Sequence, residues 1–254
     1  MLKIILFSLT IIFLIPHFID MPGHSTPVYN HKEQYDSSLK FINTLQKVSN
    51  AADVINQGRY TKNSFEYALI VSKILRKRFY HGFSQYRFSE NFIAVSTDYL
   101  FNNNIACLVT PEDIMRYSYA GCSQLVIVFA EIMKQNRVNY RTISFPHHLA
   151  IEFYLTDSWY FFDPNMEPEL SKEQRDLKNW RHSSDSIKKH YSSADHDLDF
   201  VFGVGQAAVI GKINGTVASR ARPFQRITFY VSQWIWAIPL CLLIPLYIKK
   251  DTTA

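Results

Sequence analysis

Three residues in the middle of the chain carry the functional groups that thiol chemistry needs: Cys122, His148 and Asp163. A cysteine attacks a carbonyl carbon as its thiolate, a neighbouring imidazole removes and returns the proton, and a third group orients that imidazole. Cys122 follows Gly121 and opens a long apolar run. The unpaired amides and the dipole at a helix start favour a thiolate. We therefore predict a nucleophilic cysteine at the start of a buried helix.

Alternation along the next strand separates two adjacent histidines. A strand over 148–155 places successive side chains on opposite faces. His147 would share the core face with the apolar residues at odd-numbered positions, whereas His148 would share a more polar face with Ala150 and Glu152. The small side chain of Ala150 leaves space for a thiol and a substrate. We expect His148 to be the base and His147 to be a packing or strand-entry residue.

The face on which Asp163 lies depends on the turn before its strand. Directly opposed residues of an antiparallel pair share a face, so Asp163 joins His148 only if an even number of residues forms the turn. A turn over 155–158 would set Asp163 opposite Ala150 and diagonal to His148, close enough to hold the imidazole. A three-residue turn without a bulge would place Asp163 on the wrong face.

The sequence around these residues resembles the core domain of the transglutaminase-like family, which is related to papain. The family opens a central helix with Gly-x-Cys, and the chain has Tyr119-Ala-Gly-Cys122. The family's His-x-x-x-Glu-Val strand resembles His148-Leu-Ala-Ile-Glu-Phe-Tyr-Leu155, and its Trp-x-x-x-Asp-Pro strand resembles Trp159-Tyr-Phe-Phe-Asp-Pro164. The resemblance covers roughly 111–168. Asn136 departs from the glycine that often follows the family's helix, a substitution that a left-handed helix cap tolerates.

The resemblance implies a papain-like fold and a triad with Cys122 as nucleophile, His148 as general base and acid, and Asp163 as the orienting carboxylate. Acyl transfer or hydrolysis on an amide or peptide substrate would then proceed through a thioester. The alternative is a non-catalytic transglutaminase-like module for binding or assembly at the cell envelope, with a polysaccharide-related role. A Cys107–Cys122 disulfide would also make the domain structural.

Four further residues are candidates for binding. Glu152 shares the face of His148 and would either tune the site electrostatically or serve as a structural partner. Tyr117 and Tyr119 are candidates for the second oxyanion donor beside the Cys122 amide, with aromatic packing as the alternative. Trp159 belongs to the third motif. No acidic loop suggests calcium, no metal site is expected, and the sequence implies no cofactor.

The hydrophobic periodicity predicts helices followed by a sheet, an α+β arrangement. Helical spacing covers 37–51 and 64–79, a strong helix start at Thr110 opens a short helix to about 117, and an apolar helix spans 122–135. A period of two then predicts strands over 138–145, 148–155 and 159–163.

Both ends of the chain are apolar. Residues 1–20 are typical of an export signal or signal anchor, and 228–248 has the length and composition of a transmembrane helix. Between them we expect a helical part over 35–105, the transglutaminase-like core over 106–170, and a charged helical or linker region over 171–226. The export-like first segment predicts a membrane protein whose catalytic domain is extracytoplasmic, on the periplasmic or cell-surface side.

Charge and composition narrow the partners. The formal net charge is +5, but the basic residues are mixed with acids and lack interleaved aromatic residues, so nucleic acid is not expected as a partner. Lipid and a protein, peptide or cell-envelope substrate remain. The basic patch over 73–78 is expected to be a solvated helix face, with contact to lipid headgroups as the alternative.

Overall fold

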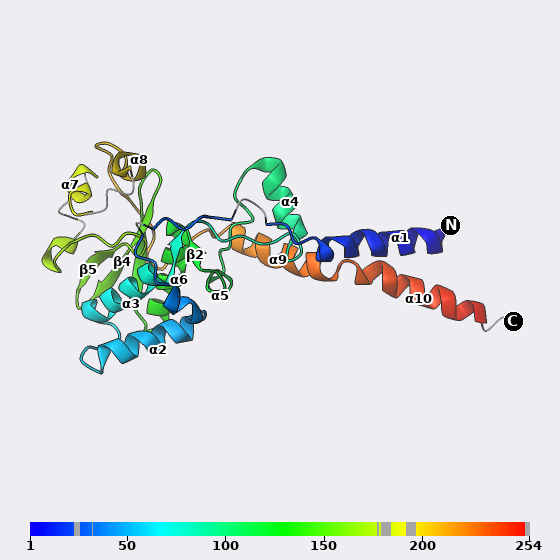
Figure 1. Cartoon of the computed structure of the whole chain (residues 1–254), viewed down its shortest axis with the longest axis horizontal. Helices are drawn as coiled ribbons and strands as arrows, with labels where there is room; N and C mark the ends of the chain where they lie inside the picture. Colours follow the sequence, from blue (N-terminus) through cyan, green and yellow to red (C-terminus); the bar gives the residue numbers. More distant parts are fainter. Residues whose placement is uncertain (23–25, 32, 177, 179–183, 192–196, 252–254) are drawn as a thin grey trace. The chain divides into compact units, whose positions relative to one another are not determined.

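The structure, a computed structural model, describes residues 1–22, 26–31, 33–176, 178, 184–191 and 197–251 (Figure 1). Two compact units are distinguished. The helical unit consists of residues 1–26, 85–108 and 218–254, and the sheet unit consists of 27–84 and 109–217. This division differs from the segments expected from the sequence. Residues 85–108 belong to the same unit as the two chain ends, and most of 171–226 belongs to the sheet unit.

Four antiparallel strands form the main sheet of the sheet unit, in the order β5-β4-β3-β6. The strands β3 (Asn139–Ser144), β4 (Leu149–Leu155) and β5 (Ser158–Phe162) follow one another along the chain and confirm the three predicted strands. The short β6 (Val209–Ile210) pairs with the free side of β3. No periodicity in the sequence had indicated a strand there.

Helix α6 (Cys122–Gln135) covers one face of this sheet, and its bounds are those expected from the sequence. The ring of Phe129 on α6 lies 4.6 Å from that of Phe153 on β4 and 5.9 Å from that of Phe162 on β5, in edge-to-face geometry. All three rings are fully buried. Large buried aromatic areas of this kind stabilise the contact between helix and sheet.

Helices α2 (Leu45–Asn56) and α3 (Phe65–Arg78) pack on α6 and on each other. The single helix expected over 37–51 is in fact a 3-10 turn (Ser37–Phe41) followed by α2. Thr44 is the reason for the break, since its backbone is extended and its hydroxyl accepts a hydrogen bond from the Lys47 amide as an N-cap. The helix expected from Thr110 is shorter than predicted and forms α5 (Pro111–Ile114).

The second face of the main sheet is covered as well, which corrects the expectation of a polar face. Ala150 belongs to a hydrophobic cluster that includes Phe161, Ile187, Tyr191 and Phe202. The last three residues come from the region around α7 (Asp185–Lys188) and α8 (Leu198–Phe202), which the sequence had suggested to be a charged linker. That region, expected over 171–226, also contains a 3-10 turn at Glu173–Arg175, and its residues 177, 179–183 and 192–196 lie outside the described part.

A two-stranded parallel ribbon completes the sheet unit. It pairs β1 (Tyr80–His81), which follows α3, with β2 (Tyr119–Ala120), which precedes α6. The ribbon thus joins the end of one helix to the start of the helix that carries Cys122.

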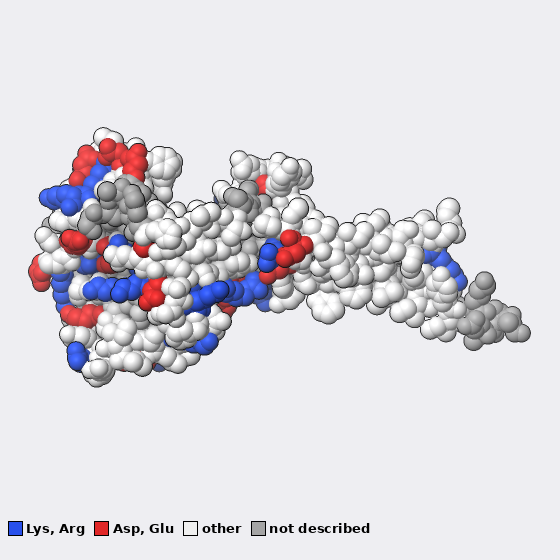
Figure 2. All heavy atoms as spheres, viewed as in Figure 1, with Lys and Arg blue, Asp and Glu red and all other residues white. Residues whose placement is uncertain are grey.

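The helical unit contains α1 (Leu2–Leu14), α4 (Phe92–Phe101), α9 (Ala221–Trp234) and α10 (Ala237–Asp251). Among the residues that the structure describes, one helical stretch, 221–248, is long and apolar enough to cross a membrane by length and composition alone. The apolar stretch at the N-terminus, 2–18, is shorter. Figure 2 shows few charged atoms over α1 and α10 on the face that it presents.

Part of the predicted transmembrane segment makes polar contacts inside the helical unit. Asn91, at the start of α4, donates from Nδ2 to the Thr228 hydroxyl at 3.0 Å, and its Oδ1 accepts from the Ser232 hydroxyl at 3.2 Å. Both α9 residues are buried. The candidate span starts at 221 rather than 228, and its first helix, α9, packs on α4 through these polar contacts.

Candidate active site

Cys122 is the first residue of α6, and Gly121 is its N-cap with an extended backbone. Hydrogen bonds of the Gln124 side chain fix the start of this helix to the segment at Ser84. Its Oε1 accepts from the Gly121 amide at 3.1 Å and from the Ser84 amide at 2.9 Å. Its Nε2 donates to the Ser84 carbonyl at 2.8 Å. Gln124 and Ser84 are buried. A satisfied buried network of this type holds the cysteine in one place.

Gly121 is required by packing rather than by an unusual backbone angle. A Cβ built at this position would collide with the ring of Phe83. The aromatic ring thus lies directly on the backbone that leads into Cys122. This close approach is a physical reason for glycine before the cysteine.

His148 immediately precedes β4 and is 6% exposed. Its ring stacks near Phe145 and meets Phe202 edge-to-face, with centroids 5.5 Å apart in the second case. Its Nε2 lies 2.7 Å from Oδ2 of Asp163, and the imidazole also forms a hydrogen bond with the Cys122 thiol. Because Nε2 is engaged by the carboxylate, Nδ1 is the nitrogen that faces the sulfur.

The other histidine is turned to a different partner. The ring of His147 stacks on Phe200 with centroids 4.0 Å apart and an interplanar angle of 2°. His147 is exposed, as is Phe200, so it does not lie on the core face as the alternation predicted. It stacks at the strand entry, and His148 is the histidine that contacts Cys122 and Asp163.

Asp163 follows β5 directly, in the register that the parity argument requires. Leu155 pairs with Ser158 and Ile151 with Phe162, so the next pair in the ladder is Ala150 with Asp163. The turn has two residues, Thr156 and Asp157, and both have positive φ angles of 46° and 68°. Two-residue turns of this kind match the twist of an antiparallel hairpin.

The Asp163 carboxylate is fully buried and saturated with donors. Oδ1 accepts from the amides of Asn165 at 3.1 Å and Met166 at 3.2 Å, and Oδ2 accepts from the Tyr191 hydroxyl at 3.0 Å in addition to His148. A buried charge is tolerated only when it is paired and hydrogen-bonded, and this one is both. The carboxylate is thereby fixed in position behind the imidazole.

These contacts shift the ionisation of all three groups. Burial raises the pKa of the Cys122 thiol, but the hydrogen bond and charge of His148 and the Leu149 amide together lower it below the usual value. Burial disfavours the imidazolium, yet the charge of Asp163 and the hydrogen bonds to Asp163 and Cys122 raise the pKa of His148 to about 10. The pKa of Asp163 is lowered despite its burial, chiefly by His148. The site favours a thiolate–imidazolium pair.

A second buried pair supports the loop that carries Asp163. Oε1 of Glu167 lies 2.7 Å from Nη1 of Arg175. Its Oε2 accepts hydrogen bonds from the Ser72 hydroxyl at 2.5 Å and from the Asp163 amide at 3.3 Å. Arg175 also donates to the Phe161 carbonyl at 2.9 Å, just before the end of β5. The Glu167–Arg175 pair therefore ties helix α3 to the end of β5.

Two of the predicted binding residues are located away from the triad. Glu152 is buried and accepts from Nε of Arg141 at 2.6 Å across the β3–β4 pair, which is the structural alternative that the sequence left open. Trp159 lies at the turn end of β5, where its ring packs beside Tyr154 and under the guanidinium of Arg141. Asp163 is at the opposite end of that strand.

The two tyrosines considered as oxyanion donors form part of an aromatic cluster. The rings of Tyr117 and Tyr119 are 5.4 Å apart, and that of Tyr119 is 5.5 Å from Tyr80. These contacts correspond to the packing alternative. The amide N–H of Cys122 has no acceptor in the described part of the chain, as is usual for the first residue of a helix, so it is available to an incoming acceptor.

All three cysteines are free thiols, so the structure contains no Cys107–Cys122 disulfide. The thiol of Cys107 is partly buried, and this desolvation raises its pKa to about 12, with the charge of Asp98 as a further cause. Among the described residues, no group of three or more His, Cys, Asp or Glu side chains is arranged to hold a metal ion.

Tyr191, Glu167 and Arg175 support the site but were not among the residues found from the sequence. Tyr191 stands 28 positions after Asp163 in a charged stretch, and no spacing rule links the two. In the sequence, the one indication of a buried role for Tyr191 was that it is an aromatic residue within a charged stretch. Comparisons with models of protein families, with curated proteins and with solved structures find no match for this chain.

Proposed function

We propose that this chain is a cysteine-dependent acyltransferase or hydrolase that acts on a carboxamide or peptide carbonyl, with a transglutaminase-like, papain-related core. The observation that carries the proposal is the continuous hydrogen-bonded series from the Cys122 thiol through His148 to the buried carboxylate of Asp163. Each group has the environment that its role needs: a helix start for the thiolate, a base beside it, and a fixed carboxylate behind the base.

The reaction begins when the Cys122 thiolate attacks the carbonyl carbon, and the carbonyl oxygen becomes an oxyanion facing the Cys122 amide. His148 gives its Nδ1 proton to the departing nitrogen, so that ammonia or an amine leaves and a thioester remains. Water or a second amine then attacks the thioester while His148 accepts a proton. When the thioester breaks, the cysteine sulfur leaves as the thiolate and His148 holds that proton again. Asp163 keeps its negative charge throughout and stabilises the imidazolium.

We further propose that the apolar helices anchor the chain in a membrane, with the sheet unit on the extracytoplasmic side. Support for the anchor comes from the apolar stretch 221–248 and from α1, which packs along α10. Membrane attachment favours a substrate at the cell envelope.

Alkylation by iodoacetamide at graded pH tests the activated thiol. We expect Cys122 to react well below pH 8, because its lowered pKa leaves a thiolate where an ordinary thiol is protonated. His148→Ala should move the reaction to higher pH. Cys122→Ala should remove the fast-reacting site and leave only Cys107 and Cys241. An ordinary pH profile at Cys122 would contradict the catalytic proposal.

The enzyme class is tested with a thiol-directed acylating probe. The full chain should form a covalent adduct that Cys122→Ala does not form, and an added amine should release the acyl group as an amide if transfer competes with hydrolysis. A chain with a reactive Cys122 that accepts no acyl probe would instead fit a binding module.

A further inference from the structure

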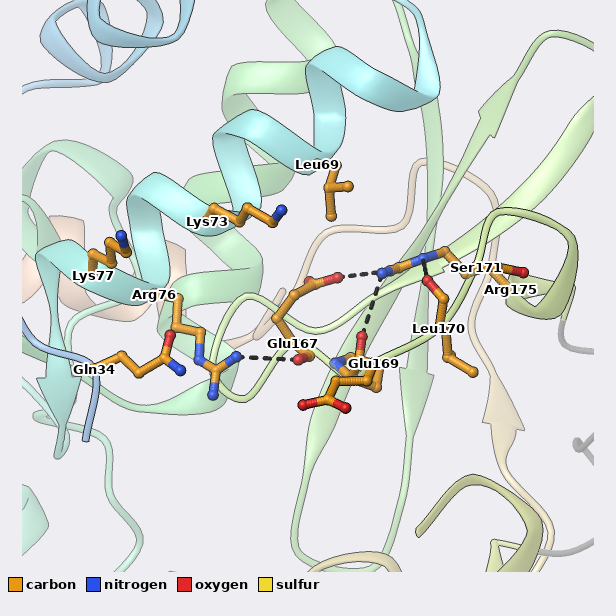
Figure 3. Close-up of a pocket in the computed structure, with 11 residues that line it drawn as sticks. Gln34, Leu69, Lys73, Arg76, Lys77, Glu167, Glu169, Leu170, Ser171 and Arg175 are labelled. Atoms are coloured by element: carbon orange, nitrogen blue, oxygen red, sulfur yellow. Dashed lines mark hydrogen bonds and ion pairs between the residues drawn. The ribbon is translucent and has the colours of Figure 1, made fainter. Parts of the chain in front are cut away.

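The sheet unit contains a pocket whose lining includes none of Cys122, His148 and Asp163. It has a volume of about 510 Å³ and lies between α3 and the loop that follows β5 (Figure 3). Small-molecule sites in proteins are commonly of this size. The proposed acyl-transfer reaction makes no use of this pocket.

One wall of the pocket is basic. Lys73, Arg76 and Lys77 are spaced by three and four residues on α3, so they lie along one side of the helix (Figure 3). In the described part of the chain, none of them forms an ion pair with a carboxylate. Like charges at this spacing repel one another. An anion placed among them would remove that repulsion. Arg78, the last residue of the same patch, is buried and donates to the carbonyls of Ile42 and Met115, so it does not belong to this wall.

On the opposite wall of the pocket, the cationic side chain is already paired with a carboxylate of the same wall. Arg175 is engaged with Glu167, whose main-chain carbonyl accepts from Nη1 of Arg76 at 3.1 Å. That contact holds Arg76 in place and leaves its other guanidinium donors available. The remaining carboxylate of the lining, Glu169, is exposed. The lining thus holds four cationic side chains, Arg175 included, against the two carboxylates of Glu167 and Glu169, and the pocket is net positive. Asp36, which is outside the lining, interacts electrostatically with Lys77 without forming an ion pair.

We propose that this pocket binds a phosphate-bearing anion through Lys73, Arg76 and Lys77, either a free small molecule or a lipid headgroup. A phosphate group offers about two negative charges and several acceptor oxygens at neutral pH, which suits three cationic donors better than a single carboxylate does. The concave shape suits a compact group.

Binding of inorganic pyrophosphate to the full chain in detergent tests the proposal by calorimetry. We expect saturable binding that weakens as the salt concentration rises. The variant Lys73→Gln/Lys77→Gln should bind roughly tenfold more weakly or worse, as two lost charge contacts imply. Glu169→Gln should bind more tightly, because it removes the unpaired carboxylate. Arg76 is left intact, since its contact with Glu167 supports the fold.

The matched control is Lys40→Gln/Lys212→Gln, which makes the same charge change at exposed positions outside the lining and should leave the affinity unchanged. A short-chain phosphatidic acid, which is a phosphomonoester like glycerol phosphate, is compared with glycerol phosphate at equal concentration to identify the source of the phosphate. Tighter binding of the lipid assigns a headgroup, and equal binding assigns a free phosphate compound. Absence of saturable binding for all three probes, or an equal loss in the control variant, would overturn the proposal.

Discussion

Cys122, His148 and Asp163 depend on neighbours that have no part in the proposed chemistry. The Asp163 carboxylate is buried completely, and it keeps its charge because two amides, a phenol and an imidazole surround it. Tyr191 is the side chain among these donors that can be changed without touching the triad or the main chain. Its hydroxyl is a positioning group, since it acts on Asp163 alone.

Replacing Tyr191 with Phe removes one hydrogen bond from the Asp163 carboxylate. We expect the free energy of unfolding to fall by about 1.5–3 kcal/mol, the range for a hydrogen bond to a charged group. The pKa of Asp163 should rise, because the Tyr191 hydrogen bond is one of the causes that lower it. A carboxylate with a lowered pKa contributes stability that is lost as pH falls through that pKa, so the acid loss of stability should begin at higher pH.

The measurements for this variant are chemical unfolding at several pH values and the pH profile of Cys122 alkylation, whose acid limb should also move to higher pH. Tyr154→Phe is the matched control, since Tyr154 lies on the exposed end of β4. If Tyr191→Phe and Tyr154→Phe behave alike, Tyr191 has no positioning role.

Among the elements, the β4–β5 hairpin sets which face Asp163 occupies. Its turn residues Thr156 and Asp157 both adopt the left-handed backbone region, which is unfavourable for residues other than glycine and worst for a β-branched residue such as Thr. The turn therefore maintains the register at a local conformational cost.

The substitution Thr156→Asn with Asp157→Gly should stabilise the hairpin, because Asn-Gly is the preferred pair for a turn with two positive φ angles. We expect a gain of about 1 kcal/mol in the free energy of unfolding with the reactivity of Cys122 unchanged. Asp157→Pro should do the opposite, since proline cannot adopt a positive φ, and should reduce both stability and Cys122 reactivity. Chemical unfolding measures the stability of the two variants, and alkylation measures the reactivity of Cys122 in each. A proline variant with wild-type reactivity would mean that this turn does not control the register.

The loop after β5 depends on the buried Glu167–Arg175 pair. Arg175→Met leaves the Glu167 carboxylate buried without its cation and should cost about 3–5 kcal/mol. The pKa of Glu167 is already raised by its burial, with Arg175 opposing that shift, and it should rise further in the variant. Because an acid with a raised pKa loses stability as pH increases, the variant should be more unstable at neutral pH than at acid pH.

The double variant Glu167→Gln/Arg175→Met is the control for this loop, since it removes both charges and retains a donor and acceptor for Ser72. We expect it to recover most of the lost stability and to lack the extra pH dependence in thermal unfolding. If the double variant is as unstable as Arg175→Met, the loss comes from packing rather than from an uncompensated charge.

For the whole molecule, the helical unit brings the two ends of the chain together. Helix α1 packs along α10, and the ammonium of Lys3 lies 4.3 Å from the ring centroid of Tyr247. The first turn of α1 thus meets the last part of α10, so the two helices run antiparallel (Figure 1). In a membrane this arrangement would place both termini on one side.

Epitope tags at the two termini should therefore respond alike when intact cells or spheroplasts are treated with protease. Both tags should be protected, whereas a tag in the exposed turn at Gln57–Gly58 of the sheet unit should be cleaved, if the sheet unit is extracytoplasmic. Different responses of the two terminal tags would contradict the antiparallel pairing in the membrane. Cleavage of both terminal tags would reverse the proposed orientation.

The local part of the site could be predicted from the sequence. The bounds of α6 follow from its apolar run. Turn parity gave the condition under which Asp163 lies on the His148 face, and the two-residue turn of the structure meets that condition. Alternation favoured His148 over His147, although the face on which that choice relied is covered by apolar side chains. The break at Thr44 is equally local, although the spacing over 37–51 did not indicate it.

Tertiary structure alone decided which distant groups complete the site. Tyr191 reaches Asp163 across 28 positions and Ser72 reaches Glu167 across 95, and a charged or polar residue has no periodicity that would reveal its partner. The same limit applies to the second sheet face, which is covered by apolar residues scattered through a charged segment. Local spacing thus determined the thiol, imidazole and carboxylate, whereas their burial, their pKa shifts and the basic pocket arise only when remote segments pack together.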